Sequence, residues 1–238
     1  MLRVTTLYDN YQHIGNLRTN WGFSCLVEFG DTAVLFDTGG DSPTLLSNID
    51  ELGIDLARVQ ALVLSHDHGD HTGGLQGVLE RCPGLKTYVC DSFSPRTKRE
   101  VTGGGGELAG VTGPIEILPG IHSTGELGAT IREQSLVVDT GSGIVVITGC
   151  AHPGIVSIVR KARQLVKGDV LLVMGGFHLM GTPGPVVERA VADLKDLGVQ
   201  KVSPSHCTGD AAIALFREAF GDNFIAGGVG LVVEFPVK

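Results

Sequence analysis

Residues 64–75 read Leu-Ser-His-Asp-His-Gly-Asp-His-Thr-Gly-Gly-Leu, and this stretch decides both the fold and the chemistry of the chain. Three histidines and two aspartates lie within residues 66–71, directly after the apolar run of residues 59–64. Imidazole and carboxylate groups are the ligands that bind zinc, manganese and iron. A solvated polar loop is the alternative, but the apolar edges of the stretch and the matching ligands elsewhere argue against it. The stretch therefore predicts a metal site at the end of a buried strand.

The composition limits the classes of protein to which the chain can belong. Its 238 residues suffice for one domain, and 42% apolar content with a mean hydropathy of +0.21 is typical of a well-buried globule. A net charge of −8 argues against partners such as nucleic acids or anionic membranes. Five scattered cysteines do not form a disulfide framework, and neither a bilayer-spanning run nor a signal peptide is seen. We expect a cytoplasmic protein that acts on a small molecule, and association into a homo-oligomer stays open.

Strand-like and helix-like segments alternate along the chain. Residues 24–29 and 32–37 flank a Gly-Asp turn and predict a β-hairpin, which is followed by a helix that begins at Ser42-Pro43. The continuous apolar run of residues 59–64 is typical of a strand buried on both faces. Further strands are predicted at 144–148, 169–174, 199–203 and 230–235, and helices at 154–166, 185–197 and 210–220. The pattern predicts an αββα sandwich, two mixed sheets covered by helices, as a single domain over residues 1–238.

Residues 91–128 fit neither half of this pattern. They include the basic stretch 92–99 and four consecutive glycines at 103–106. Loops of this length in compact domains are usually lids, binding loops or disordered segments. We predict an insertion that overhangs the site as a lid, with a solvated connector as the alternative.

Three further histidines each follow a predicted strand by a few residues. They are His152, His178 and His206. In α/β sheets, ligands bind where strand ends continue into loops. A single such histidine is more often a hydrogen-bonded structural residue, but three of them favour metal ligation. For His178 both interpretations stay open.

The motifs together resemble the metallo-β-lactamase superfamily. Its signature His-x-His-x-Asp-His matches residues 66–71, and the segments 37–39, 149–152 and 205–206 follow in the order of the superfamily. Residues 119–126, 133–136 and 148–154 look like one branch, the metallo-hydrolases related to the archaeal dihydropterin (ribofuranosylaminobenzene phosphate) synthase. The resemblance covers almost the whole chain, and it implies a metal-dependent hydrolase without fixing the substrate.

Site residues carry over from this resemblance by position. Two divalent ions are implied, with zinc as the first expectation and manganese or iron as alternatives. Asp37 is implied to accept a hydrogen bond from a ligand histidine and so to orient it. The implied ligands are His66, His68 and His152 for one ion and Asp70, His71 and His206 for the other.

The chain departs from the common pattern at Cys150. Most members of the superfamily have there an aspartate that bridges the two metals. Three interpretations stay open: Cys150 bridges as a thiolate, His152 replaces the missing ligand, or one ion binds weakly. His122 lies close to the place of a third histidine in other branches, so it is either a ligand or part of a pocket wall.

Two dications about 3.5–4 Å apart polarise a substrate oxygen and lower the pKa of a shared water toward 7, which generates a hydroxide nucleophile at neutral pH. Asp70, besides binding metal, is the candidate acceptor of the proton. A Cys207–His206 dyad is an alternative nucleophile, although His206 has the stronger role as a ligand.

The substrate is predicted from weaker signals. Arg96, Lys98 and Arg99 form the densest basic cluster of an acidic chain, and such groups can clamp a phosphate or carboxylate. A solvated charge run explains them equally well. We therefore expect a hydrolase, phosphodiesterase-like, that acts on a phosphoester or a phosphorylated heterocycle.

Two other functions remain as alternatives. The first is a synthase or lyase that joins a pterin to a phosphorylated aminobenzene ribofuranoside, although Phe93 is the only aromatic residue between residues 91 and 128. The second is a metal-binding sensor or scaffold with a degenerate site, which would predict lost ligands.

Overall fold

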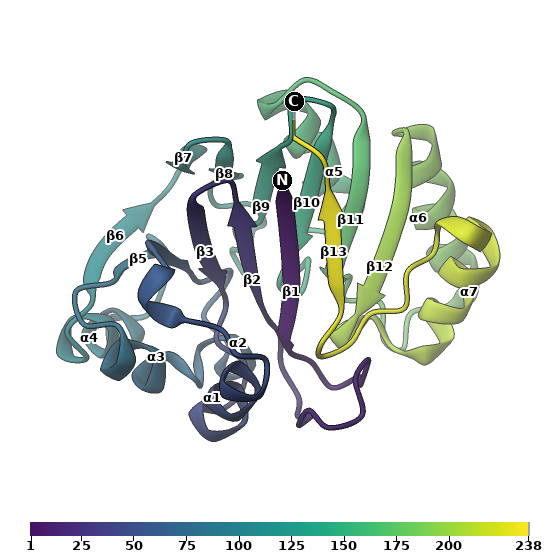
Figure 1. Cartoon of the computed structure of the whole chain (residues 1–238). Helices are drawn as coiled ribbons and strands as arrows, with labels where there is room; N and C mark the ends of the chain where they lie inside the picture. The colour runs from purple at the N-terminus through teal and green to yellow at the C-terminus, as the bar shows by residue number, and fades with distance from the viewer. Residues whose placement is uncertain (238) are drawn as a thin grey trace.

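The computed structural model describes residues 1–237, which form two β-sheets packed face to face with helices on both outer sides (Figure 1). In spatial order the first sheet contains β13 (Val232–Phe235), β1 (Leu2–Tyr8), β2 (Ser24–Phe29), β3 (Thr32–Phe36), β4 (Ala61–Val63), β5 (Lys86–Cys90) and β6 (Glu107–Val111). The second contains β12 (Val199–Ser205), β11 (Val170–Gly176), β10 (Ile144–Thr148), β9 (Leu136–Asp139), β8 (Ile121–Ser123) and β7 (Ile115–Leu118). Both sheets combine parallel and antiparallel pairs, so the predicted αββα sandwich of two mixed sheets is confirmed.

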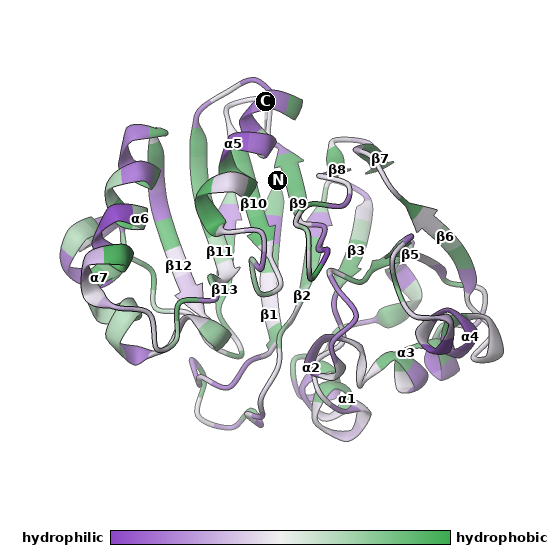
Figure 2. Ribbon diagram, turned by 180° about the vertical axis from the view of Figure 1, so that it is seen from behind, coloured by the Kyte–Doolittle hydropathy of each residue, from purple (hydrophilic) through white to green (hydrophobic). Residues whose placement is uncertain are grey.

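The helices cover the outer faces of the sheets. Those on the first sheet are α1 (Ser42–Glu51), α3 (Leu75–Arg81) and α4 (Pro95–Gly103), and those on the second are α5 (Ile155–Leu165), α6 (Gly184–Asp196) and α7 (Asp210–Phe220). Single turns are formed by α2 (Gly69–Thr72), η1 (Leu56–Arg58), η2 (His206–Thr208) and η3 (Gly221–Asn223). Hydrophobic residues dominate the strands, while the helices alternate between hydrophobic and hydrophilic positions (Figure 2). Among the described residues, no helix is long and apolar enough to cross a bilayer.

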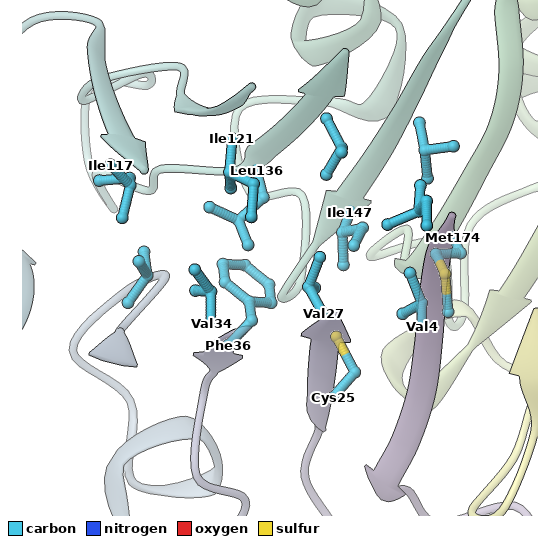
Figure 3. Packing of buried hydrophobic residues seen from close by; sticks show 14 of the residues in the cluster. Val4, Cys25, Val27, Val34, Phe36, Ile117, Ile121, Leu136, Ile147 and Met174 are labelled. Carbon is cyan, nitrogen blue, oxygen red and sulfur yellow. The ribbon is translucent and has the colours of Figure 1, made fainter. Parts of the chain in front are cut away.

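The main core lies between the two sheets. Val27 and Phe36 of the first sheet face Ile147 and Met174 of the second, and all four side chains are almost completely buried (Figure 3). Burial of each such side chain contributes about 1.5–3 kcal/mol relative to exposure. Two further apolar clusters fill the spaces between the sheets and their helices. The strands therefore form a rigid base for the loops that follow them.

The helix α1 begins at Ser42, as predicted, but a different residue caps it. Asp41, not Ser42, is the N-cap: its backbone is extended, and its Oδ1 accepts a hydrogen bond from Thr44 N at 2.7 Å. Pro43 occupies the first turn as expected. The carboxylate satisfies a helix N–H that would otherwise lack a partner, which explains why the helix begins one residue after it.

Residues 91–128 supply regular elements of both sheets in place of the expected insertion. In this stretch α4 packs against the first sheet, β6 pairs in parallel with β5 at its edge, and the β7–β8 hairpin extends the second sheet. The signal for these strands is weak because β6 contains a glycine and the hairpin strands have only three or four residues each. Short edge strands bury few side chains, so their hydrophobic pattern is faint.

Candidate metal centre

The candidate ligands lie in loops that directly follow four strands: β4, β10, β11 and β12. Four non-glycine residues in residues 1–237 have positive φ, and each lies at the end of a strand beside this centre: Asp37 (57°), Ala151 (62°), His178 (52°) and His206 (50°). Such backbone conformations cost about 1–3 kcal/mol each and persist only where the surroundings enforce them. The strained positions therefore mark a part of the fold that is shaped for function.

One group of potential ligands consists of His66, His68 and His152, here called the three-histidine group. One ring nitrogen of each lies within 4.8 Å of the others. His66 Nε2 and His68 Nδ1 are 3.1 Å apart, close to the separation of about 3.3 Å between two nitrogens on a tetrahedral zinc. His152 Nε2 is buried without a hydrogen-bond partner. A buried nitrogen without a partner is costly, and a metal ion would satisfy it.

A second group, here called the mixed group, consists of Asp70, His71, Cys150 and His206. Their ligand atoms also lie within 4.8 Å of one another. Cys150 Sγ is 3.2 Å from His71 Nε2, and Asp70 Oδ2 is 3.3 Å from His206 Nε2. His206 Nε2 is a second buried nitrogen without a hydrogen-bond partner. Carboxylate, imidazole and thiol in one cluster suit a divalent transition metal.

Cys150 connects the two groups. Its sulfur belongs to the mixed group and also to a third set of converging ligand atoms with His152 and His178. His178 is exposed, and its ring centroid is 4.2 Å from that of His152. The sulfur therefore lies within reach of two sets of candidate ligand atoms, and His178 joins the cluster from the end of β11.

Hydrogen bonds to Asp37 and Ser65 fix the orientation of two candidate ligand rings. Asp37 Oδ2 accepts from His71 Nδ1 at 2.7 Å, and the same oxygen accepts from Ser65 Oγ, also at 2.7 Å. Ser65 Oγ in turn accepts from His66 Nδ1 at 2.8 Å. These bonds leave Nε2 of each ring directed at the other ligand atoms, where it can bind a metal once it carries no proton. Asp37 thus orients His71 directly and His66 through Ser65.

His206 is oriented from the N-terminal part of the chain. Asn10 Oδ1 accepts from His206 Nδ1 at 2.9 Å, and Asn10 Nδ2 donates to the His206 carbonyl at 3.4 Å. The sequence interpretation gave no role to Asn10 or Ser65. Ser65 lies in the quoted stretch of residues 64–75 without being a candidate ligand, and the contact of Asn10 spans 196 positions of the chain.

Glu133 is a further residue that the sequence interpretation did not assign to the site. It is completely buried, and its two carboxylate oxygens accept hydrogen bonds from three consecutive backbone N–H groups, those of residues 150–152, at 2.8–3.0 Å. Burial raises the pKa of this carboxyl to about 7. Because it holds the backbone of Cys150 and His152, Glu133 positions ligands of both groups. The only signal in the sequence was a polar Glu-Gln-Ser run directly before an apolar strand.

Charge differs between the two groups. Burial lowers the pKa of His66 well below its usual value and that of His152 to about 4, so both rings are neutral at pH 7. Burial also opposes the charge on His71, but Asp37 outweighs this effect and raises its pKa to about 9. Despite its partial burial, the two imidazoles beside Asp70 hold the pKa of that carboxyl well below its usual value. The mixed group is therefore the more strongly charged part of the centre.

The alternative Cys207–His206 dyad does not fit the geometry. His206 Nδ1 is bonded to Asn10 and its Nε2 faces Asp70, so neither nitrogen is directed at Cys207. Cys207 is nearly buried, and its sulfur donates to the Cys150 carbonyl at 3.6 Å. Contact between the two sulfurs raises the pKa of the Cys150 thiol, although a thiol that coordinates a metal is deprotonated outright.

The basic cluster lies on α4, outside both groups. The Arg96 side chain is 84% exposed and pairs with Glu100 at 2.8 Å, Lys98 Nζ donates to the Asp91 carbonyl, and Arg99 is exposed. His122 is placed in β8, opposite Glu116 of β7, and belongs to none of the three sets of ligand atoms.

The segment 64–72, here called the metal-binding loop because it carries four candidate ligands, is nevertheless attached to α4. Asp67, which lies between two ligand histidines, accepts hydrogen bonds from Ser94 N and Thr97 Oγ1 at the start of this helix. The helix that carries the basic cluster therefore supports the loop from outside.

Comparison with known proteins gives a consistent assignment. The Metallo-beta-lactamase superfamily matches residues 22–206. A 7,8-dihydropterin-6-methyl-4-(beta-D-ribofuranosyl)-aminobenzene-5'-phosphate synthase of Methanocaldococcus jannaschii is 26% identical over 98% of this chain and 97% of its own length. A solved metal-dependent hydrolase of the beta-lactamase superfamily is 27% identical, with a TM-score of 0.85 over 99% of this chain and 100% of the other. A metallo-beta-lactamase fold protein of Bacillus subtilis, at 18% identity and a TM-score of 0.72 over 98% of this chain and 100% of its own, shares the fold.

Proposed function

The chain belongs to the metallo-beta-lactamase superfamily, and we propose that it is a two-metal hydrolase that cleaves a phosphoester in a small molecule. The observation that carries this proposal is the position of Cys150. Its sulfur converges with Asp70, His71 and His206 on one side and with His152 and His178 on the other. One side chain that reaches two adjacent sets of ligands is what a pair of bridged ions requires.

The donor set fits divalent ions. Imidazole nitrogens, one carboxylate and one thiol are the ligands of zinc and related metals, and two buried imidazole nitrogens lack any other partner. When bound, such a pair of ions supplies polarisation of the scissile ester and a water of lowered pKa.

The protein's own residues hold this chemistry in place. Asp37 and Asn10 direct the Nε2 atoms of His71 and His206 toward the centre. Asp70 remains ionised at neutral pH, so it can hold an ion through one oxygen; its low pKa suits this role better than that of a general base. Glu133 fixes the backbone that carries Cys150.

Of the three interpretations left open by the absent aspartate, we favour the bridging thiolate. His152 converges with His66 and His68 and with Cys150 and His178, but it does not belong to the mixed group, where Cys150 lies. Cys150 lies 3.2 Å from His71 Nε2, inside the mixed group. Zinc is the expected metal, because thiolate and imidazole together suit it better than manganese.

A synthase is the second candidate. The relative with this printed activity matches nearly the full length of the chain, and its name includes a phosphorylated aromatic compound. In that case the two ions would activate a leaving group without the need for an attacking water. Both candidates require the same metal centre. They differ in the group that attacks the substrate, which is water in the hydrolase and a second substrate in the synthase.

The test combines metal content with turnover. We expect about two zinc equivalents per chain and hydrolysis of bis(p-nitrophenyl) phosphate, with loss of metal and of activity in His66→Ala and in His206→Ala. His122→Ala is the matched control, because this histidine lies outside the ligand sets. Full metal loading without turnover of this substrate would favour the synthase, and failure to bind metal would support a degenerate scaffold.

A further inference from the structure

Trp21 is an exposed aromatic side chain at the edge of the metal centre. It is the only tryptophan of the chain, and 46% of it is exposed. Its ring centroid is 4.8 Å from that of His206, and the two ring planes are tilted by 52°. Large aromatic side chains usually bury their surface, and this one belongs to none of the three core clusters. An exposed indole beside a metal ligand is typical of a binding surface.

The backbone around Trp21 is held firmly. Trp21 N donates to Asn20 Oδ1 at 2.8 Å, and Asn20 Nδ2 donates to Asp41 Oδ2 at 2.9 Å. On the other side, Phe23 N donates to the Asp70 carbonyl, so the segment is attached to the metal-binding loop itself. Because the backbone is already ordered, only the indole side chain has to be ordered when it binds a partner.

Close backbone contacts keep the segment in place. A side chain at Gly22 would meet the Asp70 carbonyl oxygen at 2.4 Å, and one at Gly40 would meet the Trp21 carbonyl oxygen at 2.6 Å. Both positions therefore require glycine. The backbone beside the indole therefore packs directly against the Asp70 carbonyl, with no room for a side chain between them.

A second exposed apolar side chain lies next to the same ligand. Met180 is 54% exposed, and its backbone N–H donates to the carbonyl of Cys207, the residue after His206. Trp21 and Met180 thus flank the turn that carries the His206 ligand. A flat aromatic ring and a flexible thioether together suit a planar aromatic ligand.

We infer that Trp21 stacks on an aromatic or heteroaromatic ring of the substrate while the phosphoryl end lies at the two ligand groups. The substrate class is therefore an aryl or heteroaryl phosphoester, and Trp21 determines the preference for the ring. The inference rests on the proposed function, because it assumes that the phosphoryl group binds at the metal centre.

The test separates the ring from the phosphoryl group. Dissociation constants are measured by calorimetry for phenylphosphonate, cyclohexylphosphonate and methylphosphonate with the zinc-loaded protein. We expect phenylphosphonate to bind about 3- to 10-fold more tightly than cyclohexylphosphonate, as is usual for a stacked aromatic pair. Trp21→Leu should abolish this ratio and Trp21→Phe should retain it, while methylphosphonate binds all three proteins equally. Leu108→Ala, which changes an exposed apolar residue on the edge strand β6, is the matched control.

Each outcome bears on one of the two proposals. A phenyl preference that survives in Trp21→Leu overturns the role of Trp21, and equal binding of the phenyl and cyclohexyl compounds to the wild type overturns the aromatic class. If the zinc-loaded wild type does not bind methylphosphonate but still binds phenylphosphonate through Trp21, only the phosphoester function is contradicted. If neither binds, both proposals fail.

Discussion

The two ligand groups of this centre differ in charge, burial and support. The three-histidine group offers only imidazole nitrogens, and His68 is exposed. The mixed group adds a carboxylate and a thiol, and its two histidines are completely buried and hydrogen-bonded to Asp37 and Asn10. Ligand charge and rigidity both raise the affinity for a cation. The comparison teaches that two neighbouring ligand groups at the ends of the same strands can differ in affinity, and we expect the mixed group to bind a metal ion more tightly.

The largest expected effect tests whether Cys150 serves both groups. Cys150→Ala removes a ligand that the two groups share, so kcat/KM should fall by at least about 1,000-fold, equivalent to about 4 kcal/mol. Cys150→Asp supplies a carboxylate at the same place and should retain most of the activity and both ions. Metal content and steady-state kinetics measure the two variants.

Cys207→Ser is the matched control for Cys150. Its sulfur contacts Cys150 but belongs to neither ligand group, so the loss should stay within about tenfold. Zinc uptake by the wild type should also release one proton from the Cys150 thiol that Cys150→Ala cannot release. Equal activity of Cys150→Ala and wild type would remove the bridge from the proposal.

The second prediction concerns the carboxylate of Asp9, which lies beside His206 of the mixed group. Asp9 is buried, its Oδ1 accepts from Tyr11 N, and its Oδ2 has no partner. Burial raises its pKa to about 6. A carboxyl whose pKa is higher in the folded than in the unfolded state binds more protons when folded, so the free energy of unfolding decreases as the pH rises from about 4 to 6.

Asp9→Asn removes this titration. In the metal-free protein the variant should be more stable than the wild type at pH 7 by up to about 3 kcal/mol, and nearly equal at pH 4. Urea denaturation with a chelator present measures both values. Zinc should reduce the difference, because a cation at His206 favours the ionised carboxyl. A difference that is the same at pH 4 and pH 7 would show that Asp9 does not titrate in this range.

The third prediction concerns the hydrogen bonds that orient the histidines of each group. Asp37→Asn weakens the acceptor of His71, so the affinity of the mixed group for zinc should fall about 10- to 100-fold. Ser65→Ala interrupts only the path to His66 and should weaken the three-histidine group instead. Competition with a chromogenic chelator measures both. Identical losses in the two variants would mean that the groups are not supported separately.

The smallest effect lies outside both groups. Arg96 is exposed and pairs with Glu100 four residues later, and solvent screens such a surface ion pair strongly. Arg96→Ala should therefore change KM less than twofold and hardly affect stability. A tenfold rise in KM for a phosphoester would instead support a clamp by the basic cluster.

Features of this structure that have a strong local sequence pattern could be predicted from the sequence, and those without one could not. Buried strands and amphipathic helices such as β10 and α7 are marked by long apolar periodicities, and the histidines after the strands follow from topology. Asn10 and Glu133 act through contacts with residues far along the chain or through backbone groups, so no local pattern indicates them. Trp21 was overlooked for a related reason: only its exposure in the folded chain distinguishes it from a core residue.

The shared carboxylate of Asp37 has a thermodynamic consequence. It contacts a histidine of the mixed group directly and one of the three-histidine group through a single hydroxyl. An ion that binds at either group therefore polarises the same hydrogen-bonded chain. Because linkage is reciprocal, each ion must alter the affinity for the other by an equal factor. For the proposed two-metal enzyme we therefore expect the uptake of the two ions to be coupled, and the side chain of Ser65 to carry that coupling.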